Sequence, residues 1–279
     1  MNDAPSNTPV YIHGNTPEEQ KRLSRLNDLL NQACLQELNL KGEDSILDLG
    51  SGLGQFSRKM AQTLGGGAHV LGIERDPEQI AAARKLATEA GDQGLVDFRE
   101  GDAASLPLAA SEWGTFSLAH ARFLLEHAPR PDRIVEQMAR AVKPGGRVFL
   151  CDDDHGDFRP WPEPPGFPAM WRAYVGTFEA NGCDPYVGRK LVSLLAGAGL
   201  TPVRNGVIFF GGCAGDDSFD ATADNLIAAF LGAKQAMLST DHLDETAFTA
   251  GLNALGAWKS DAASSLWYSA CFAEGIAPI

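Results

Sequence analysis

Three glycines at alternate positions follow the short apolar run Ser45–Leu49 and precede a segment with helical periodicity: Gly50, Gly52 and Gly54. Glycine has no side chain, so it lets the backbone turn sharply and approach a ligand closely. The start of the helix that follows offers free N–H donors and a partial positive charge. This order of strand, glycine turn and helix predicts a binding site for a nucleotide-like cofactor.

Two acidic residues are placed to complete such a site. Asp48 stands two residues before the glycine turn, where its carboxylate could accept a hydrogen bond or face a cation. Glu74 ends a second predicted strand, 69–73, at about the separation from Gly50 at which an acid binds ribose hydroxyls. A dinucleotide motif would read G-x-G-x-x-G, but Gln55 occupies its third glycine position. The pattern therefore disfavours a nicotinamide-dependent oxidoreductase.

These segments resemble the motifs of the class I S-adenosylmethionine (SAM) dependent methyltransferases. Ile46–Gly54 is similar to their first motif and Val70–Asp76 to their second. Glu100–Ala103 is similar to the third, whose acid faces the adenine end of SAM, and Lys143–Gly146 to the turn into the fifth strand. The resemblance is specific over roughly residues 11–154. It implies an α/β fold: a Rossmann-like, mostly parallel sheet with a C-terminal antiparallel hairpin and helices on both faces.

The resemblance also implies the cofactor, SAM, its product, S-adenosylhomocysteine, and the residues that surround it. The glycine turn and the ends of the second, third and fourth strands would form the site. Tyr11, which precedes the first helix, would either close over the methionine carboxylate or simply pack. The expected cofactor contacts are Tyr11, Asp48, Gly50, Ser51, Gly52, Gly54, Glu74, Arg75, Gly101, Asp102, Ala103, Ala119 and His120.

Two polar residues, His120 and Arg122, end the predicted fourth strand or follow it directly. Ligands of open α/β sheets bind beyond the carboxyl ends of the strands, so both side chains are expected near the reacting groups. His120 is a candidate base or a neighbour of the cofactor. Arg122 would either clamp a substrate anion or pair with the acids after the fifth strand. The segment lacks the paired prolines of methyltransferases that act on exocyclic amines, which disfavours nucleic-acid bases as acceptors.

Three adjacent carboxylates, Asp152–Asp154, follow the predicted fifth strand, 147–151, and precede His155. Adjacent carboxylates at a pocket mouth are costly unless they are solvated, paired or bound to a metal. Three interpretations stay open: a solvated acidic loop with one arginine pair, a site for a cationic or amine substrate, and a divalent-metal site. We expect no metal ligand, treat His155 as a candidate base, and assign Asp153 and Trp171 to substrate binding.

Composition narrows the class of protein. A net charge of −13 and a pI near 4.8 argue against a non-specific nucleic-acid binder and against an anionic membrane surface. No apolar run reaches the roughly 18 residues of a membrane helix, and the first residues lack the order of a signal peptide. Five widely spaced cysteines without a C-x-x-C pair fit reduced thiols in a cytoplasmic protein.

One composite domain is expected over the 279 residues. It would comprise a tail and helical lid (1–40), a SAM-binding core (41–155), and a C-terminal part (156–279) that completes the sheet with a helical insertion over the substrate. Further strands are expected at 96–100, 203–210 and 266–272, and helices at 169–180, 188–198, 218–238 and 244–258.

The predicted function is transfer of a methyl group from SAM to a small organic acceptor by in-line displacement. Alternatives are a protein side-chain methyltransferase, a non-catalytic SAM-binding protein and, less favoured, an NAD-dependent oxidoreductase. The sequence does not fix the acceptor atom or the oligomeric state.

Overall fold

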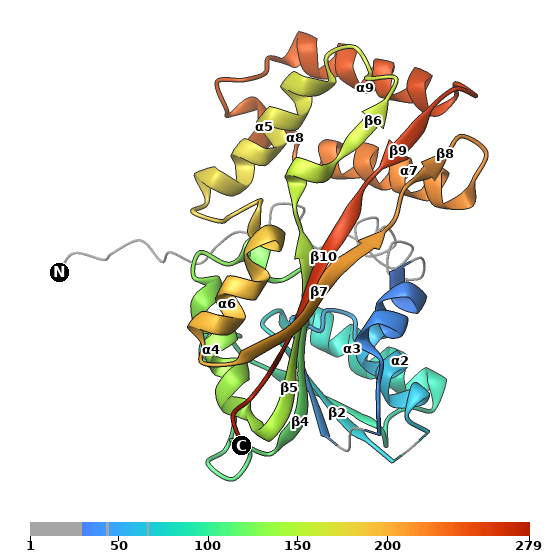
Figure 1. Ribbon diagram of the computed structural model, residues 1–279. Helices are drawn as coiled ribbons and strands as arrows, with labels where there is room; N and C mark the ends of the chain where they lie inside the picture. Colours follow the sequence, from blue (N-terminus) through green and yellow to red (C-terminus); the bar gives the residue numbers. More distant parts are fainter. Residues whose placement is uncertain (1–29, 43–44, 66) are drawn as a thin grey trace, which may run out of the picture.

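The structure is a computed structural model that describes residues 30–42, 45–65 and 67–279. A seven-stranded sheet forms its centre, in the order β3-β2-β1-β4-β5-β10-β7 (Figure 1). The strands are β1 (Ser45–Leu49), β2 (His69–Glu74), β3 (Val96–Glu100), β4 (Phe116–Arg122), β5 (Val142–Asp153), β7 (Thr201–Phe209) and β10 (Ser269–Ile276). The first five pair in parallel, while β10 runs antiparallel to both β5 and β7. The predicted fold class is confirmed, including the antiparallel pair at the sheet edge.

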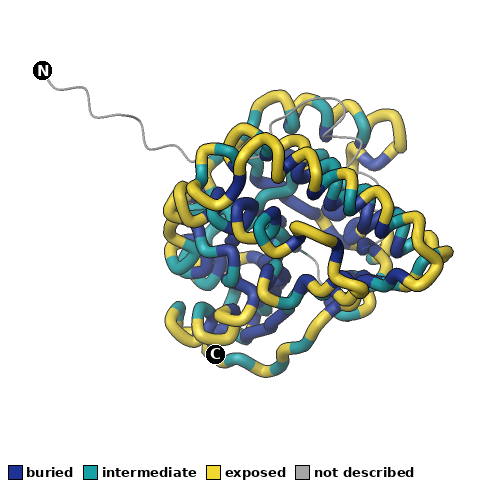
Figure 2. Tube along the Cα trace, turned by 90° about the horizontal axis from the view of Figure 1, so that it is seen from above, coloured by how far each residue is buried: buried dark blue, intermediate teal, exposed yellow. Residues whose placement is uncertain are grey.

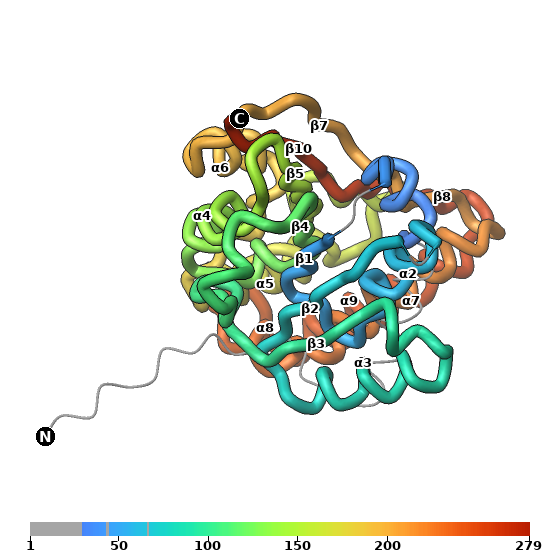
Figure 3. The backbone as a smooth tube through the Cα atoms, turned by 90° about the horizontal axis from the view of Figure 1, so that it is seen from below, coloured from blue at the N-terminus to red at the C-terminus, as the bar shows by residue number. Residues whose placement is uncertain are grey.

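Helices cover both faces of this sheet, as Figure 3 shows from below. Helical residues 30–38 and helices α2 and α3 lie on one face, and α4 and α6 lie on the other. Their bounds are α2 (Gln55–Thr63), α3 (Pro77–Ala90), α4 (Pro131–Ala141) and α6 (Leu191–Gly197).

Side chains of β1 alternate between the two resulting cores, because successive strand residues point to opposite faces. Ile46 packs in the core that contains Met60 of α2. Its neighbour Leu47 packs in the core that contains Ile134 of α4. All four of these side chains are buried, so the sheet is covered on both sides.

A second layer of elements forms a cap beyond the carboxyl ends of the parallel strands, at the top of Figure 1. Among the described residues, four helices and a three-stranded sheet in the order β6-β9-β8 build it. The cap elements are β6 (Arg159–Trp161), α5 (Phe167–Ala180), β8 (Gly212–Cys213), α7 (Asp217–Gly232), α8 (Lys234–Leu238), α9 (Glu245–Lys259) and β9 (Ser265–Trp267). Seen from above, exposed positions lie on the outer turns of the cap and buried ones face inward (Figure 2).

Three local predictions need correction. Strand β5 runs from Val142 to Asp153, so Asp152 and Asp153 end the strand and do not begin a loop. The predicted helix 218–238 divides into α7 and α8 at Ala233. The predicted strand 266–272 divides at Tyr268, because its first residues pair with β6 and β8 while the later ones join the large sheet.

The predictions for the N-terminal segment and for the cellular location are not tested by the structure. Tyr11 and the start of the predicted lid fall outside the described residues. Within the described part of the chain, no helix combines the length and apolar character needed to cross a bilayer. The cytoplasmic location stays a prediction.

Candidate active site

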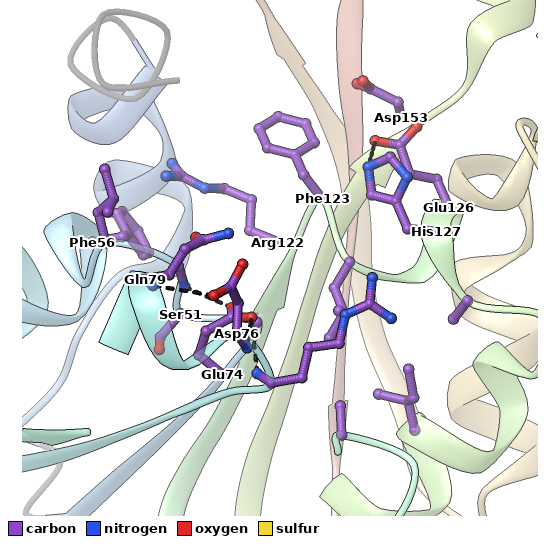
Figure 4. Close-up of a pocket in the computed structure, with 18 of the residues that line it drawn as sticks. Ser51, Phe56, Glu74, Asp76, Gln79, Arg122, Phe123, Glu126, His127 and Asp153 are labelled. Atoms are coloured by element: carbon purple, nitrogen blue, oxygen red, sulfur yellow. Dashed lines mark hydrogen bonds and ion pairs between the residues drawn. The ribbon is translucent and has the colours of Figure 1, made fainter. Parts of the chain in front are cut away.

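A cavity of about 1190 Å³ opens between the carboxyl ends of the parallel strands and the cap. Its lining begins at the glycine loop after β1 and ends at side chains of α5, α7 and Tyr268. Pockets for a single small ligand measure roughly 300–1,000 Å³, so this cavity has room for two. Figure 4 shows that its polar groups come from both the sheet and the turns above it.

The glycine loop has the backbone geometry that its sequence predicts. Gly50, Gly52 and Gly54 have φ angles of +67°, +52° and +68°, a region that side chains strongly disfavour. The Gly52 amide donates to Glu74 Oε2 at 3.0 Å, which ties the loop to the end of β2. Gly54 has a packing role, since a Cβ there would lie 2.2 Å from the Phe98 ring.

Glu74 is held at the cavity edge by backbone donors. Its Oε1 accepts the amides of Arg75 and Asp76 at 2.8 and 3.0 Å. A carboxylate has about four lone-pair sites, so Glu74 keeps acceptor capacity for ligand hydroxyls. Asp102 lines the same part of the cavity, and its Oδ1 accepts the amide of Ala104 at 2.8 Å.

A buried pair lies beneath the cofactor loop. Asp48 Oδ1 and His120 Nδ1 are 2.7 Å apart, and Asp48 Oδ2 accepts the Ser57 hydroxyl at 2.5 Å. The His120 ring packs between Phe56 and Phe149, with centroid distances of 4.9 and 6.1 Å. His120 also lines the cavity. Asp48 therefore fixes the orientation of the imidazole, whatever its chemical role.

Arg122 joins the sheet to the helical residues 30–38. Its Nη2 donates to Asn31 Oδ1 at 3.0 Å. The guanidinium carbon lies 4.3 Å from the centroid of the Phe56 ring, within cation–π range. The sequence analysis did not foresee this link. Arg122 also lines the cavity, so its position allows the predicted contact with substrate. That contact stays a prediction.

The three adjacent aspartates occupy three different environments, and the interpretation as a solvated loop is wrong. Asp152 is fully buried and accepts the amides of residues 124–126 at 2.8 to 3.3 Å. Burial raises the pKa of Asp152 to about 7. These backbone hydrogen bonds act in the opposite direction and lower this pKa, but the effect of burial is larger. Asp154 is buried in a two-pronged pair with Arg189, both contacts being 2.5 Å, so the expected arginine pair does form. Asp153 faces the cavity.

A second buried cluster lies at the cap side of the cavity. His155 Nδ1 is 3.2 Å from the Tyr268 hydroxyl, which also hydrogen-bonds the Asp153 carboxylate. Burial lowers the pKa of His155 to about 4, so this imidazole is neutral at pH 7. Burial also raises the pKa of Asp153 to about 8. The Glu126 carboxylate, in the turn η1 (Leu125–His127), is 3.4 Å from His155 Nε2.

Aromatic side chains enclose this cluster. The His155 ring has Trp171, Tyr174 and Phe178 around it, with centroid distances of 5.5, 5.7 and 4.9 Å. The indole N–H of Trp171 donates to the His155 carbonyl at 3.0 Å. The surroundings are thus apolar on most sides, which strengthens every electrostatic interaction inside.

Most predicted site residues line the cavity, but three of them are not among the described lining residues. Ala119 is fully buried within β4, and Gly54 packs on Phe98, so the geometry does not support a cofactor contact by either. Tyr11 lies outside the described residues.

The sequence analysis missed two members of the second cluster. Glu126 follows β4 after a short turn, so its place at the carboxyl edge was a usable signal. Tyr268 carried no such signal, because it reaches the cavity only through the break between β9 and β10.

Comparison with known proteins identifies the core. A methyltransferase domain matches residues 40–163. A ubiquinone biosynthesis O-methyltransferase from Xanthomonas oryzae pv. oryzae is 37% identical over 131 residues, which are 47% of this chain and 52% of that protein. The chain thus spans about half the length of this relative.

Solved structures extend the likeness to the whole fold. The cyclase SpnF superposes with a TM-score of 0.57 at 20% identity, covering 90% of this chain and 82% of its own. A geranyl diphosphate methyltransferase in complex with SAM superposes with a TM-score of 0.53 at 16% identity, covering 94% and 91%. These neighbours share the Rossmann-like fold of this chain.

The matched domain makes the class more specific. Residues 40–163 are thus similar to the methyltransferase domain of class I SAM-dependent enzymes, and SAM is the cofactor that this similarity supports.

Proposed function

We propose that the protein transfers a methyl group from SAM to a small organic acceptor. One observation carries this proposal: a single cavity joins the glycine loop and Glu74 to the buried cluster of Asp153 and His155. Methyl transfer needs a nucleophile held in line with the donor, and much of the rate can come from that positioning. In this proposal residues 41–155 hold the cofactor, and residues 156–279 complete the sheet and cover the acceptor.

The charges of the cavity indicate the class of acceptor. The acceptor side presents the carboxyl groups of Glu126 and Asp153 and a neutral imidazole. Among the described residues, this cluster contains no cationic side chain to hold a phosphate, whereas a phenol, alcohol or amine needs none. His155 and Asp153 are the groups placed to take the proton of such an acceptor, a step worth about 10²–10⁴-fold in rate.

The test has two stages. Calorimetry with SAM, S-adenosylhomocysteine and NAD establishes the cofactor, and we expect binding of the first two only. A panel of phenols, alcohols, amines, peptides and nucleotides is then assayed for S-adenosylhomocysteine release. Turnover restricted to neutral or cationic small molecules supports the proposal. Binding of NAD without any response to SAM would end it, and SAM binding without turnover of any acceptor would favour a non-catalytic SAM-binding protein.

A further inference from the structure

Three potential metal ligands converge at the cap side of the cavity. Glu126, Asp153 and His155 each offer one donor atom, and these atoms lie within 4.8 Å of one another. They come from the turn η1, the last residue of β5 and the turn η2 (His155–Asp157). Figure 4 shows the side chains of Glu126 and Asp153 near each other at the upper right. Clusters of acidic residues are common in proteins without a bound ion. The evidence for a metal site therefore depends on the environment of His155.

The hydrogen bonds of His155 show which nitrogen faces the cluster. Tyr268 has one hydroxyl proton and lies between His155 Nδ1 and the Asp153 carboxylate. When Asp153 is ionised, as it would be on a metal ion, its carboxylate only accepts, so Tyr268 would donate to Asp153 and accept a hydrogen bond from His155 Nδ1–H. Nε2 is then left as a lone pair directed at the cluster. His155 is only 4% exposed, and Nε2 has no hydrogen-bond partner among the described residues.

This arrangement matches the way proteins hold histidine on a metal. A ligating histidine almost always donates its other ring N–H to an oxygen group that fixes its tautomer. Tyr268 is that group here. Asp153 Oδ1 is likewise buried without a hydrogen-bond partner among the described residues, so a second donor atom is available at the same place.

We propose that Glu126, Asp153 and His155 bind a divalent transition-metal ion inside the acceptor side of the cavity. One imidazole and two carboxylates suit Zn²⁺, Mn²⁺ or Fe²⁺ better than Mg²⁺ or Ca²⁺, which prefer all-oxygen shells. Donors at about 2.1 Å from a tetrahedral ion lie about 3.4 Å apart, so the side chains need to close by up to about 1.4 Å. This proposal departs from our sequence expectation that the chain holds no metal ligand.

The proposed ion would have open positions toward the cavity. Three protein ligands leave room for an acceptor oxygen, and coordination would favour the ionised form of a hydroxyl. That catalytic role rests on the proposed function, whereas metal binding itself does not. The other group with metal-ligand geometry, Asp154, Asp157 and Cys271, carries no proposal because Arg189 already occupies Asp154.

The experiment uses Co²⁺ as a spectroscopic probe on full-length, chelator-treated protein. Protein-bound Co²⁺ acquires ligand-field absorption bands, so titration reports stoichiometry and affinity without any activity measurement. We expect one ion per chain, displaced by Zn²⁺. His155→Ala, Asp153→Asn and Glu126→Gln should each raise the Kd by about 100-fold or more, because loss of an outer-shell partner alone costs about 10–100-fold.

Two sets of variants make the result decisive. Tyr268→Phe keeps the ring and all three ligands, and should raise the Kd by about 10–100-fold through the lost hydrogen bonds. His69→Ala, at the exposed amino end of β2, and Asp157→Asn, in the other group, should bind Co²⁺ as the parent protein does. Calorimetry with S-adenosylhomocysteine verifies that each variant retains the folded cofactor site.

The proposal is overturned if the parent protein shows no Co²⁺ bands, or if the bands survive unchanged in both His155→Ala and Asp153→Asn. Loss of binding in Asp157→Asn alone would move the site to the other group and also overturn it. A Co²⁺ site that behaves as expected in a protein without methyl transfer would refute the proposed function and leave the metal site standing.

Discussion

The two ends of the cavity are built in different ways. The cofactor end is assembled from neighbouring segments, the glycine loop and the end of β2, and is held by backbone groups. Its acid, Glu74, already accepts three amides. The acceptor end is assembled from Glu126, Asp153, His155 and Tyr268, which are far apart in the chain, and it is held by side chains.

This difference has an electrostatic consequence. Backbone amides satisfy the charge at the cofactor end, so that end is formed before any ligand arrives. At the acceptor end, the buried atoms Asp153 Oδ1 and His155 Nε2 lack hydrogen-bond partners within the described structure. Unsatisfied buried polar atoms are costly, and at functional sites a ligand commonly completes them. Variants at the two ends should therefore separate cofactor binding from turnover.

The largest expected effect is on turnover at the acceptor end. Asp153→Asn should lower kcat/KM by about 10²–10⁴-fold, the range for loss of a group that handles the acceptor proton. The Kd for S-adenosylhomocysteine should stay within about twofold of the parent value, because Asp153 ends β5, which lies two strands away from β1 and its glycine loop. Steady-state kinetics and calorimetry measure the two quantities. Asp157→Asn is the matched control, and equal loss of cofactor binding and turnover in Asp153→Asn would mean that the two ends are not independent.

The next effect concerns the glycine loop. Gly52→Val places a branched side chain at a φ of +52° in the cavity lining, with its Cβ 3.1 Å from Gln79 Oε1. SAM affinity should fall by at least about 100-fold, or about 2.7 kcal/mol. Gly65→Val is the control, since Gly65 has a φ of +64° but nothing within 4 Å of an added Cβ.

Both glycine variants share the backbone cost of a positive φ, about 1–2 kcal/mol of unfolding free energy. Urea denaturation measures that cost, and calorimetry measures SAM affinity. If Gly65→Val weakens SAM binding as much as Gly52→Val does, the effect is general destabilisation and the loop has no special role.

A smaller effect is expected at the ribose position. Glu74→Ala removes one carboxylate that is predicted to accept ribose hydroxyls, which should cost about 2 kcal/mol, or roughly 30-fold in SAM affinity. It also removes an acceptor for the Gly52 amide, so Glu74→Gln should retain part of the affinity. Glu89→Ala, at an exposed position of α3, is the control. Unchanged affinity in Glu74→Ala would place the ribose elsewhere.

The same contrast explains how far the sequence could be interpreted. The sheet, most helices and the cofactor end follow from local spacing, because a glycine loop, its strand and its helix are contiguous. Asp152 was misread as part of a solvated loop because its partners are the amides of residues 124–126, which pack against it only in the folded chain. Tyr268 could not be found, since its role depends on a break between two strands that belong to different sheets. Long-range packing, which spacing does not encode, decides the acceptor end.

The smallest expected effect concerns an acid that pairs with β3, the strand next to the one that ends at Glu74. Arg99 of β3 donates to both carboxylate oxygens of Glu112 at 2.8 and 2.9 Å, and this hydrogen bonding lowers the pKa of Glu112 from 4.5 to about 2. Above pH 4.5 the carboxylate is ionised in both the folded and the unfolded chain, so the pair contributes its full stability. Between pH 4.5 and pH 2 the unfolded chain takes up a proton that the folded chain does not, and this contribution is lost.

Glu112→Gln should therefore lower the free energy of unfolding at pH 7 by about 1 kcal/mol, a modest value because the pair is partly exposed. The difference between the variant and the parent protein should shrink as the pH falls from 4.5 toward 2. Urea denaturation at pH 7, 4.5 and 2.5 measures it, and Glu89→Gln, whose pair with Lys85 is exposed and 3.8 Å long, is the control. A difference that stays constant across this range would show that Glu112 stabilises the loop by packing and not through its charge.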